Sequence, residues 1–187
     1  REFKTLENTD HNYELVDTDA KLDALVKLLK NSTSYCFDTE TTSVDAMVAE
    51  LVGLAFSVKA GEAYYVPVSE SREEASTVLI KFKEIFEDSS KEVIAQNLKY
   101  DLTVLKSYGI ELKGKFFDTM IAHYLLEPDQ KHGMDILAET YLSYKPQSIV
   151  ELIGKKGKNQ GSMRDVEVKT VAEYAGEDAD ITFQLKQ

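Results

Sequence analysis

The chain has 187 residues, of which 43% are hydrophobic, enough apolar material for the core of one ordinary globular domain. Its formal net charge of −11 argues against a protein that grips nucleic acid by basic charge alone, because neutralising phosphates requires clustered Lys and Arg. No apolar stretch approaches the roughly 18 residues of a membrane span, and Cys36 is the single cysteine, so a soluble, cytoplasmic protein without an intrachain disulfide is expected.

The N-terminal part of the chain is predicted to contain strands with one helix among them. Residues 12–16 favour a strand, and Asp17 or Thr18 can cap the helix that follows. That helix has an apolar stripe formed by Leu22, Leu25, Val26 and Leu29. Apolar runs then predict strands at residues 35–40, 51–58 and 63–68, the last two joined by a Gly-containing turn at 59–62.

The C-terminal part is predicted to be mostly helical. Ser71 and Glu74 have the spacing of a capping box before an amphipathic helix. Residues 92–96 resemble a short buried strand, and residues 102–108 a helix that ends at Gly109. From residue 119 onward the helical pattern is interrupted only by Pro128, Pro146 and a basic loop at 154–161. Strands followed by mostly helices predict an α/β or α+β sheet with helices packed against it.

Two acidic residues follow an apolar run in the predicted strand 35–40. Asp38 and Glu40 are two positions apart, so on a strand both carboxylates point to the same face. Burying charge there is costly unless it is paired or bound to metal. The pair therefore favours a site for a divalent cation at this strand.

A second constellation lies near the C-terminus. Tyr174 and Asp178 are four residues apart, so on a helix they occupy one face. Asp180 points elsewhere, whereas Glu177 could replace Asp178, and periodicity alone does not choose between the two. Asp101 follows the predicted strand at 92–96 and lies near a helix N-terminus, where a carboxylate is favoured.

In this order and with these separations, the acidic islands resemble the motifs of the DEDD exonuclease superfamily, in its tyrosine-containing branch. The resemblance runs from about Tyr13 to the end of the chain and is closest to the 3′→5′ proofreading domains of bacterial family A polymerases, the DNA polymerase I family. The motifs that carry it are Phe37-Asp38-Thr39-Glu40-Thr41, Gln96-Asn97-Leu98-Lys99-Tyr100-Asp101, Phe117-Asp118-Thr119-Met120, His132-Gly133-Met134-Asp135, Lys156-Gly157-Lys158-Asn159-Gln160 and Tyr174-Ala175-Gly176-Glu177-Asp178.

This resemblance implies a ribonuclease H-like mixed β-sheet flanked by α-helices and a site for two divalent metal ions. One ion would be held by Asp38, Glu40 and Asp178, and the second by Asp38 and, through water, Asp101. An all-oxygen site suits Mg²⁺, with Mn²⁺ as a substitute. The resemblance also favours Asp178 over Glu177 and gives Tyr174 the role of orienting the attacking water.

The same resemblance implies which residues meet the DNA strand. The residues expected to contact or lie near the terminal nucleotides are Thr39, Val44, Gln96, Asn97, Tyr100, Lys131 and His132, with the loop 156–160 nearby. Val44 and Val150, with Ile149 adjacent, stand where the family often has bulkier wedge side chains, so weaker stacking on a base is expected. The chain is one residue shorter than the family pattern around Lys131.

The expected function is metal-dependent proofreading that releases 5′ mononucleotides from a frayed or single-stranded DNA 3′ end. The chain is then expected to be a single, monomeric exonuclease domain, a piece of a longer polymerase whose polymerase domain is absent. Two alternatives stay open. One is a catalytically silent binding or scaffolding domain, and the other is an RNA-trimming exonuclease of the same branch, which the 2′-hydroxyl would distinguish.

Overall fold

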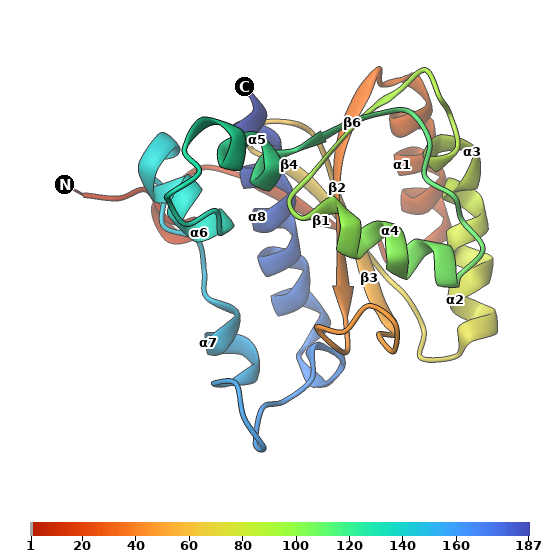
Figure 1. Cartoon of the computed structure of the whole chain (residues 1–187). Helices are drawn as coiled ribbons and strands as arrows, with labels where there is room; N and C mark the ends of the chain where they lie inside the picture. Colours follow the sequence, from red (N-terminus) through yellow and green to blue (C-terminus); the bar gives the residue numbers. More distant parts are fainter. Residues whose placement is uncertain (1) are drawn as a thin grey trace.

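A six-stranded mixed sheet forms the centre of the molecule in the computed structural model, which describes residues 2–187 (Figure 1). The strand order is β1-β4-β3-β2-β5-β6, in which β2, β3 and β4 are antiparallel neighbours and the other pairs are parallel. The strands are β1 (Asn12–Leu15), β2 (Ser34–Thr41), β3 (Leu51–Lys59), β4 (Glu62–Pro67), β5 (Glu92–Ala95) and β6 (Lys115–Asp118).

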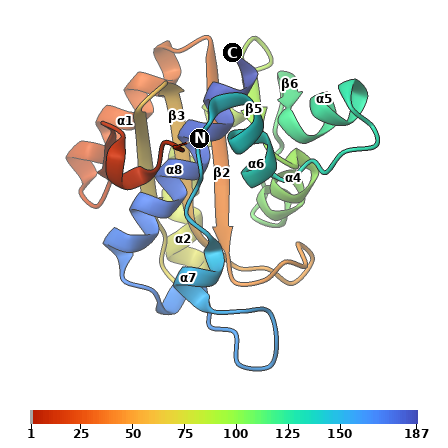
Figure 2. The ribbon, with the colours of Figure 1, turned by 90° about the vertical axis from the view of Figure 1, so that its left-hand side faces the viewer.

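Helices cover both faces of this sheet. One face carries α1 (Asp19–Asn31), α2 (Arg72–Leu79), η2 (Ile80–Phe82), α3 (Lys83–Phe86) and α4 (Leu98–Ser107). The long helix α8 (Val168–Lys186) crosses the other face and runs over the strands, as the view from that side shows (Figure 2). The remaining helical segments are η1 (Leu6–Asn8), α5 (Thr119–Leu126), α6 (Met134–Leu137), η3 (Ala138–Leu142), α7 (Ile149–Ile153) and η4 (Met163–Asp165).

The apolar patterns explain these layers. The first seven residues of β3 are all buried, which is what a strand covered on both faces requires. The helix α1 buries the predicted stripe through Leu22, Leu25 and Leu29, and the Thr18 side chain caps it by accepting from the Lys21 backbone N–H at 3.3 Å. The predicted α/β architecture is thereby confirmed.

Two elements differ from the sequence prediction. Helix α4 begins at Leu98, four residues earlier than predicted, and β6 was not predicted at all. One side chain accounts for the early start, because the Asp118 carboxylate accepts hydrogen bonds from the backbone N–H groups of Asn97 and Leu98, at 3.2 and 2.8 Å. Asp118 ends β6 and lies far along the chain, so a local pattern does not reveal this cap.

The segment between β6 and α8 holds short helical pieces rather than one long helix. Pro128 and Pro146 fall between these pieces, as the breaks predicted, and Gly109 closes α4 with a left-handed φ of +76°. Within residues 2–187, none of the helices has both the length and the apolar character that crossing a bilayer demands. The pieces after β6 stand beside α8 and form one wall of the cavity described below (Figure 1).

Candidate active site

Strand β2 presents the first two acidic side chains of the site. Asp38 pairs with Ala55 of β3, and Glu40 pairs with Gly53, so both carboxylates leave the same face of the sheet. Glu40 is 6% exposed, and Asp38 is partly buried. The ladder is irregular directly after Glu40, where the register with β3 shifts and the strand leaves the sheet.

Helix α8 presents the third carboxylate to the same place. Tyr174 and Asp178 lie one turn apart on the helix face turned toward β2, as the four-residue spacing predicts. The close approach of α8 to the sheet depends on Gly176, because a Cβ there would stand 2.9 Å from the Tyr13 ring of β1. Asp180 points to the other side and accepts a 2.7 Å hydrogen bond from the Tyr13 hydroxyl.

The three carboxylates converge. Asp38, Glu40 and Asp178 each offer one oxygen, and these oxygens all lie within 4.8 Å of one another. The Asp178 Oδ1 atom is buried and has no hydrogen-bond partner among the described residues. Because an ionised oxygen in that position requires a positive partner, the donor set fits a hard divalent cation.

The electrostatics of the cluster point the same way. Burial raises the pKa of Asp38 to about 7. Burial, followed by repulsion from Asp38, raises the pKa of Glu40 and of Asp178 well above the ordinary values. Like charges held this close are difficult to ionise together, so protons or a cation must compensate them at neutral pH.

Asp101 lies outside this cluster and is held separately. It stands in the first turn of α4, is 2% exposed, and accepts a 2.6 Å hydrogen bond from the Thr39 hydroxyl. Burial and the nearby Asp38 raise its pKa well above the ordinary value. Thr39 points away from Asp38 and Glu40 because neighbouring residues of a strand face opposite sides. Its hydroxyl serves Asp101 and so is already occupied by a bond within the protein.

The cluster opens into a cavity of about 440 Å³ between the sheet, α8 and the segments after β6. Its wall on the sheet side includes Asp38 and Gln96, and its wall on α8 includes Tyr174 and Asp178. The lining residues contributed by the other segments and by the end of α8 are Met134, Asp135, Glu139, Lys145, Pro146, Gln147, Ser148, Ile149 and Thr182. A tyrosine and carboxylates of the cluster therefore line one cavity, the arrangement in which an active site is looked for.

Comparison with known proteins decides the family. The sequence profile of a family described as "3′-5′ exonuclease" matches residues 13–187. The DNA polymerase I of Borreliella burgdorferi is 34% identical over 187 residues, which cover 98% of this chain, and that of Pseudomonas aeruginosa is 37% identical over 195 residues, which cover the whole chain. The chain belongs to the 3′–5′ exonuclease family. It spans about a fifth of the length of these relatives, 20% and 21%.

Solved structures confirm the fold of this exonuclease domain. Trypanosoma brucei RNase D superposes with a TM-score of 0.75 at 15% identity, over 94% of this chain and 64% of that protein. Brucella melitensis NrnC with bound Mg²⁺ gives 0.65 at 20% identity, over 83% of this chain and 71% of that protein. The predicted ribonuclease H-like sheet is therefore confirmed. That the chain is a nuclease domain follows from the family match instead.

Gln96, which the sequence predicted to contact nucleotides, lines the cavity of the exonuclease. Its amide donates a 2.8 Å hydrogen bond to the backbone carbonyl of His132 and accepts one from the Thr119 hydroxyl. The His132 ring in turn meets His123, with 2.6 Å between their Nδ1 atoms. Gln96 therefore ties the end of β5 to the segment that carries His132, and of these two residues only Gln96 lines the cavity that holds the carboxylates.

Other predicted contacts of the exonuclease are not among the residues that line the cavity. The Tyr100 hydroxyl hydrogen-bonds Thr41 and the Ser43 carbonyl, so it anchors the loop after β2. Asn97 is exposed and has a left-handed φ of 61°. Val44, in the loop that Tyr100 anchors, is 87% exposed. Asn97 and Val44 therefore expose one polar and one apolar side chain to solvent.

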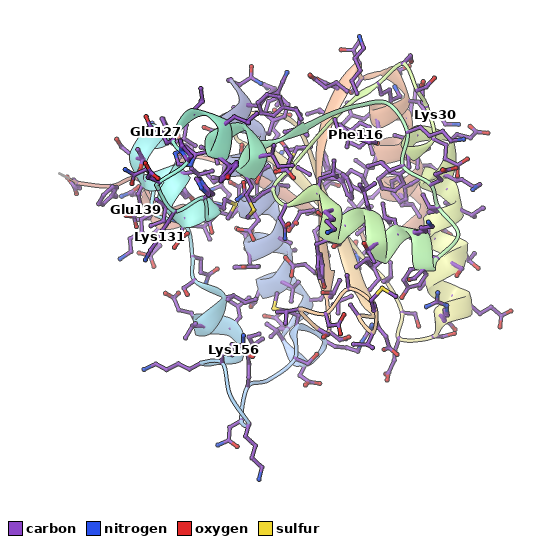
Figure 3. All side chains as sticks on the ribbon, viewed as in Figure 1. Lys30, Phe116, Glu127, Lys131, Glu139 and Lys156 are labelled. Atoms are coloured by element: carbon purple, nitrogen blue, oxygen red, sulfur yellow. The ribbon has the colours of Figure 1, made fainter. Side chains whose placement is uncertain are left out.

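The predicted basic contacts are spread widely. Lys131 is exposed and is not among the residues that line the cavity. Figure 3 shows Lys156 on the loop after α7, far from Lys131 near α6. Val150 is 41% exposed, and its neighbour Ile149 lines the cavity. Of these residues only Ile149 lines the cavity.

Several cavity residues were missed by the sequence prediction. Thr182 continues the Tyr174 and Asp178 face by one further turn, so helical periodicity alone would have found it. Lys145 and Gln147 lie in an irregular segment, for which no periodic signal exists. Glu177 is fully buried and contacts that segment rather than the other carboxylates, which explains structurally why it is separate from Asp178.

Proposed function

We propose that this chain is a metal-dependent 3′→5′ exodeoxyribonuclease that removes mismatched 3′-terminal nucleotides and releases 5′ mononucleotides. The observation that carries the proposal is the convergence of Asp38, Glu40 and Asp178 beside Tyr174 in one cavity of a 3′–5′ exonuclease domain. Its relatives named DNA polymerase I favour DNA as the substrate. The fold likeness to RNase D does not choose between DNA and RNA.

The proposal assigns four carboxylates to two Mg²⁺ ions, with Mn²⁺ as a substitute. Asp38, Glu40 and Asp178 would hold one ion, and Asp38, with Asp101 through water, would hold the second. When bound, such ions supply positive charge to the phosphoryl oxygens and lower the pKa of water. The unpartnered Oδ1 of Asp178 and the raised pKa values of the cluster support a cationic occupant.

Tyr174 would position the attacking water through its hydroxyl. Its side chain is 8% exposed, and burial, together with Asp178, Glu40 and Asp38, raises its pKa. The hydroxyl therefore keeps its proton at neutral pH and acts as a hydrogen-bonding group rather than as a general base. Orientation of the water is the contribution that such a group makes to hydrolysis.

The residues predicted to contact nucleotides would hold the 3′ end of a DNA strand. Gln96, Asn97 and Tyr100 stand on the sheet side, Lys131 and His132 on the α6 side, and Val44 on the loop after β2. Thr39 would act through Asp101, because its hydroxyl is bonded to that carboxylate. A strand lying between these groups would bring its terminal phosphodiester to the carboxylates.

The proposed partners are a single-stranded DNA 3′ end or a frayed primer terminus, and the polymerase part of a longer parent chain. The second partner follows from relatives that are about five times as long as this chain. In that setting the proofreading site would act in the bacterial cytoplasm during replication and repair. No membrane partner is proposed.

The test is a 5′-labelled single-stranded DNA oligonucleotide incubated with the chain in Mg²⁺, with EDTA and Asp178→Asn as controls. A ladder that shortens from the 3′ end, and that disappears in both controls, is the expected result. An RNA oligonucleotide of the same sequence runs in parallel, since the 2′-hydroxyl distinguishes the substrates. A folded protein that leaves both oligonucleotides intact would overturn the proposal. Faster degradation of the RNA than of the DNA oligonucleotide would show that RNA is the substrate instead.

A further inference from the structure

Lys145 stands out in the acidic cavity. It is the one Lys or Arg among the residues found to line the cavity within residues 2–187, whereas the carboxylates of Asp38, Asp135, Glu139 and Asp178 all line it. Its side chain is exposed and forms no ion pair with any described carboxylate. Its ammonium group is therefore available to a ligand that enters the cavity.

The backbone that carries Lys145 is fixed on both sides. Its N–H donates a 2.8 Å hydrogen bond to the Lys4 carbonyl, and the Lys4 N–H donates one of 2.9 Å to the Ser143 carbonyl. Pro146 follows directly and restricts Lys145 to extended backbone conformations. An exposed side chain thus starts from a rigid position, which reduces the entropy lost when it binds a ligand.

Glu177 provides the strongest anchor of this segment. Its carboxylate is fully buried and accepts a 2.6 Å hydrogen bond from the Tyr144 hydroxyl and a 2.8 Å bond from the Gln147 N–H. These two donors flank Lys145 in sequence. Charge-assisted hydrogen bonds of this kind are about twice as strong as neutral ones. The carboxylate therefore holds residues 144–147 against α8.

The anchor and the carboxylate cluster share one helix. Glu177 and Asp178 are adjacent in α8, yet their side chains serve opposite walls of the cavity. Any shift of α8 moves both walls together, so the position of Lys145 relative to Asp178 is kept constant. Such coupling is useful where a ligand must be held by both walls at once.

A phosphodiester strand is the ligand that this arrangement fits. Its backbone carries one negative charge per nucleotide, and an unpaired ammonium group opposite the acidic cluster offers that charge a partner. We propose that Lys145 binds a backbone phosphate next to the scissile one and that Glu177 is the positioning residue that holds its segment. This inference rests on the proposed function and extends it to the substrate contact.

The first test removes the charge of Lys145. Lys145→Gln is expected to raise KM for single-stranded DNA about tenfold with kcat unchanged, because an exposed hydrogen bond to a charged group supports ground-state binding. Its slope of log affinity against log salt, measured in EDTA with a labelled oligonucleotide, should fall by about 0.7, as loss of one phosphate contact predicts. Lys27→Gln is the matched control, since Lys27 is exposed on α1 at the opposite face of the sheet.

The second test removes the anchor. Glu177→Leu loses both hydrogen bonds and is expected to raise KM about as much as Lys145→Gln, while Glu177→Gln can keep both bonds and should bind DNA nearly normally. In the double variant with Lys145→Gln, Glu177→Leu should add little, because both changes act on one contact. Tyr144→Phe removes one of the two bonds and takes the place of Glu177→Leu should that variant fail to fold.

The outcomes separate this inference from the proposed function. Absence of cleavage by the wild type would contradict the proposed nuclease function. The salt dependence of DNA binding in EDTA would still test the phosphate contact of Lys145. Equal salt slopes and equal KM values for Lys145→Gln and Lys27→Gln would overturn the role of Lys145. Fully additive effects of Glu177→Leu and Lys145→Gln, or a fall in kcat alone, would overturn the positioning role of Glu177.

Discussion

The Thr39 hydroxyl donates a 2.6 Å hydrogen bond to the buried carboxylate of Asp101, joining β2 to the first turn of α4. Thr39 lies between Asp38 and Glu40, so one strand segment places two carboxylates in the cluster with Asp178 and fixes a third carboxylate on its other side. The bond lowers the pKa of Asp101, which burial and Asp38 otherwise raise. Thr39 therefore helps to keep Asp101 ionised.

Replacing Thr39 by Val is expected to weaken both stability and activity. The variant keeps the shape of the side chain but leaves Asp101 short of a donor, which costs about 1–3 kcal/mol of unfolding free energy. Nucleotide release should fall about 10- to 100-fold, as is usual when a residue that orients a metal ligand is lost. Urea denaturation and a cleavage assay measure the two effects. Thr39→Ser keeps the hydroxyl, so its stability and its rate of nucleotide release should stay near those of the wild type. A Thr39→Val variant that equals the wild type in both quantities would contradict the prediction.

Asp178→Asn is expected to separate stability from catalysis. The variant should lose about 10³-fold or more in nucleotide release, because several kcal/mol of transition-state stabilisation depend on bound metal. In EDTA its Tm should equal or exceed that of the wild type, because repulsion from Asp38 and Glu177 is relieved. The Tm increase that Mn²⁺ causes in the wild type should disappear.

A matched control for Asp178→Asn is Glu73→Gln, which removes one exposed negative charge on α2. This control should retain nucleotide release and the Mn²⁺-dependent rise in Tm. A metal ligand at position 178 predicts a loss of about 10³-fold or more, so cleavage by Asp178→Asn above one tenth of the wild-type rate would contradict that role.

The metal-free domain is expected to lose stability as the pH rises. The folded pKa values of Asp38 (about 7), Glu40, Asp101 and Asp178 all lie above those of the unfolded chain, so the folded state binds more protons. Their stabilising contribution is complete below about pH 4 and is lost as the pH rises through the folded pKa values. Each 1 kcal/mol lost lowers Tm by about 2–4 °C for a domain of this size.

Thermal scans from pH 5 to 8 in EDTA, with and without the Asp38→Asn substitution, measure this effect. The substitution removes one titrating group, so it should flatten the decline. Mn²⁺ replaces protons on the carboxylates, and its stabilising effect should therefore be larger at pH 8 than at pH 5. A Mn²⁺ effect that is independent of pH would show that the ion does not bind this cluster.

Which of the site side chains share one face of a strand or helix could be predicted from their spacing in the sequence, because strand and helix geometry fix that relation. Asp38 and Glu40 share a strand face, and Tyr174 and Asp178 share a helix face, as the two-residue and four-residue spacings require. The catalytic and metal-binding roles of these residues stay predictions. Geometry brings three of the four predicted carboxylates into one cluster and places Asp101 next to it.

Long-range contacts set the features that the sequence did not reveal. Asp118 caps the start of α4 from a distant strand, so the helix begins before its own local signal. Glu177 and Asp178 have similar periodicity, and only the contact of Glu177 with Tyr144 separates them. Lys145 lies in an irregular segment whose position depends on Lys4 and Glu177 together, and neither contact leaves a local pattern.

Enlarging Val44 is expected to strengthen the grip on a 3′ end. Val44 is 87% exposed in the loop that Tyr100 anchors, so a larger side chain meets no steric barrier. Val44→Phe adds an aromatic face, and stacking on a base contributes about 1–3 kcal/mol, which predicts a KM for single-stranded DNA about five- to 150-fold lower. Ile80→Phe, at a 60% exposed position in η2 on the opposite face of the sheet, is the control and should leave KM unchanged. Steady-state cleavage of a single-stranded oligonucleotide measures both variants. An unchanged KM in Val44→Phe would show that the side chain at position 44 does not contact the terminal base.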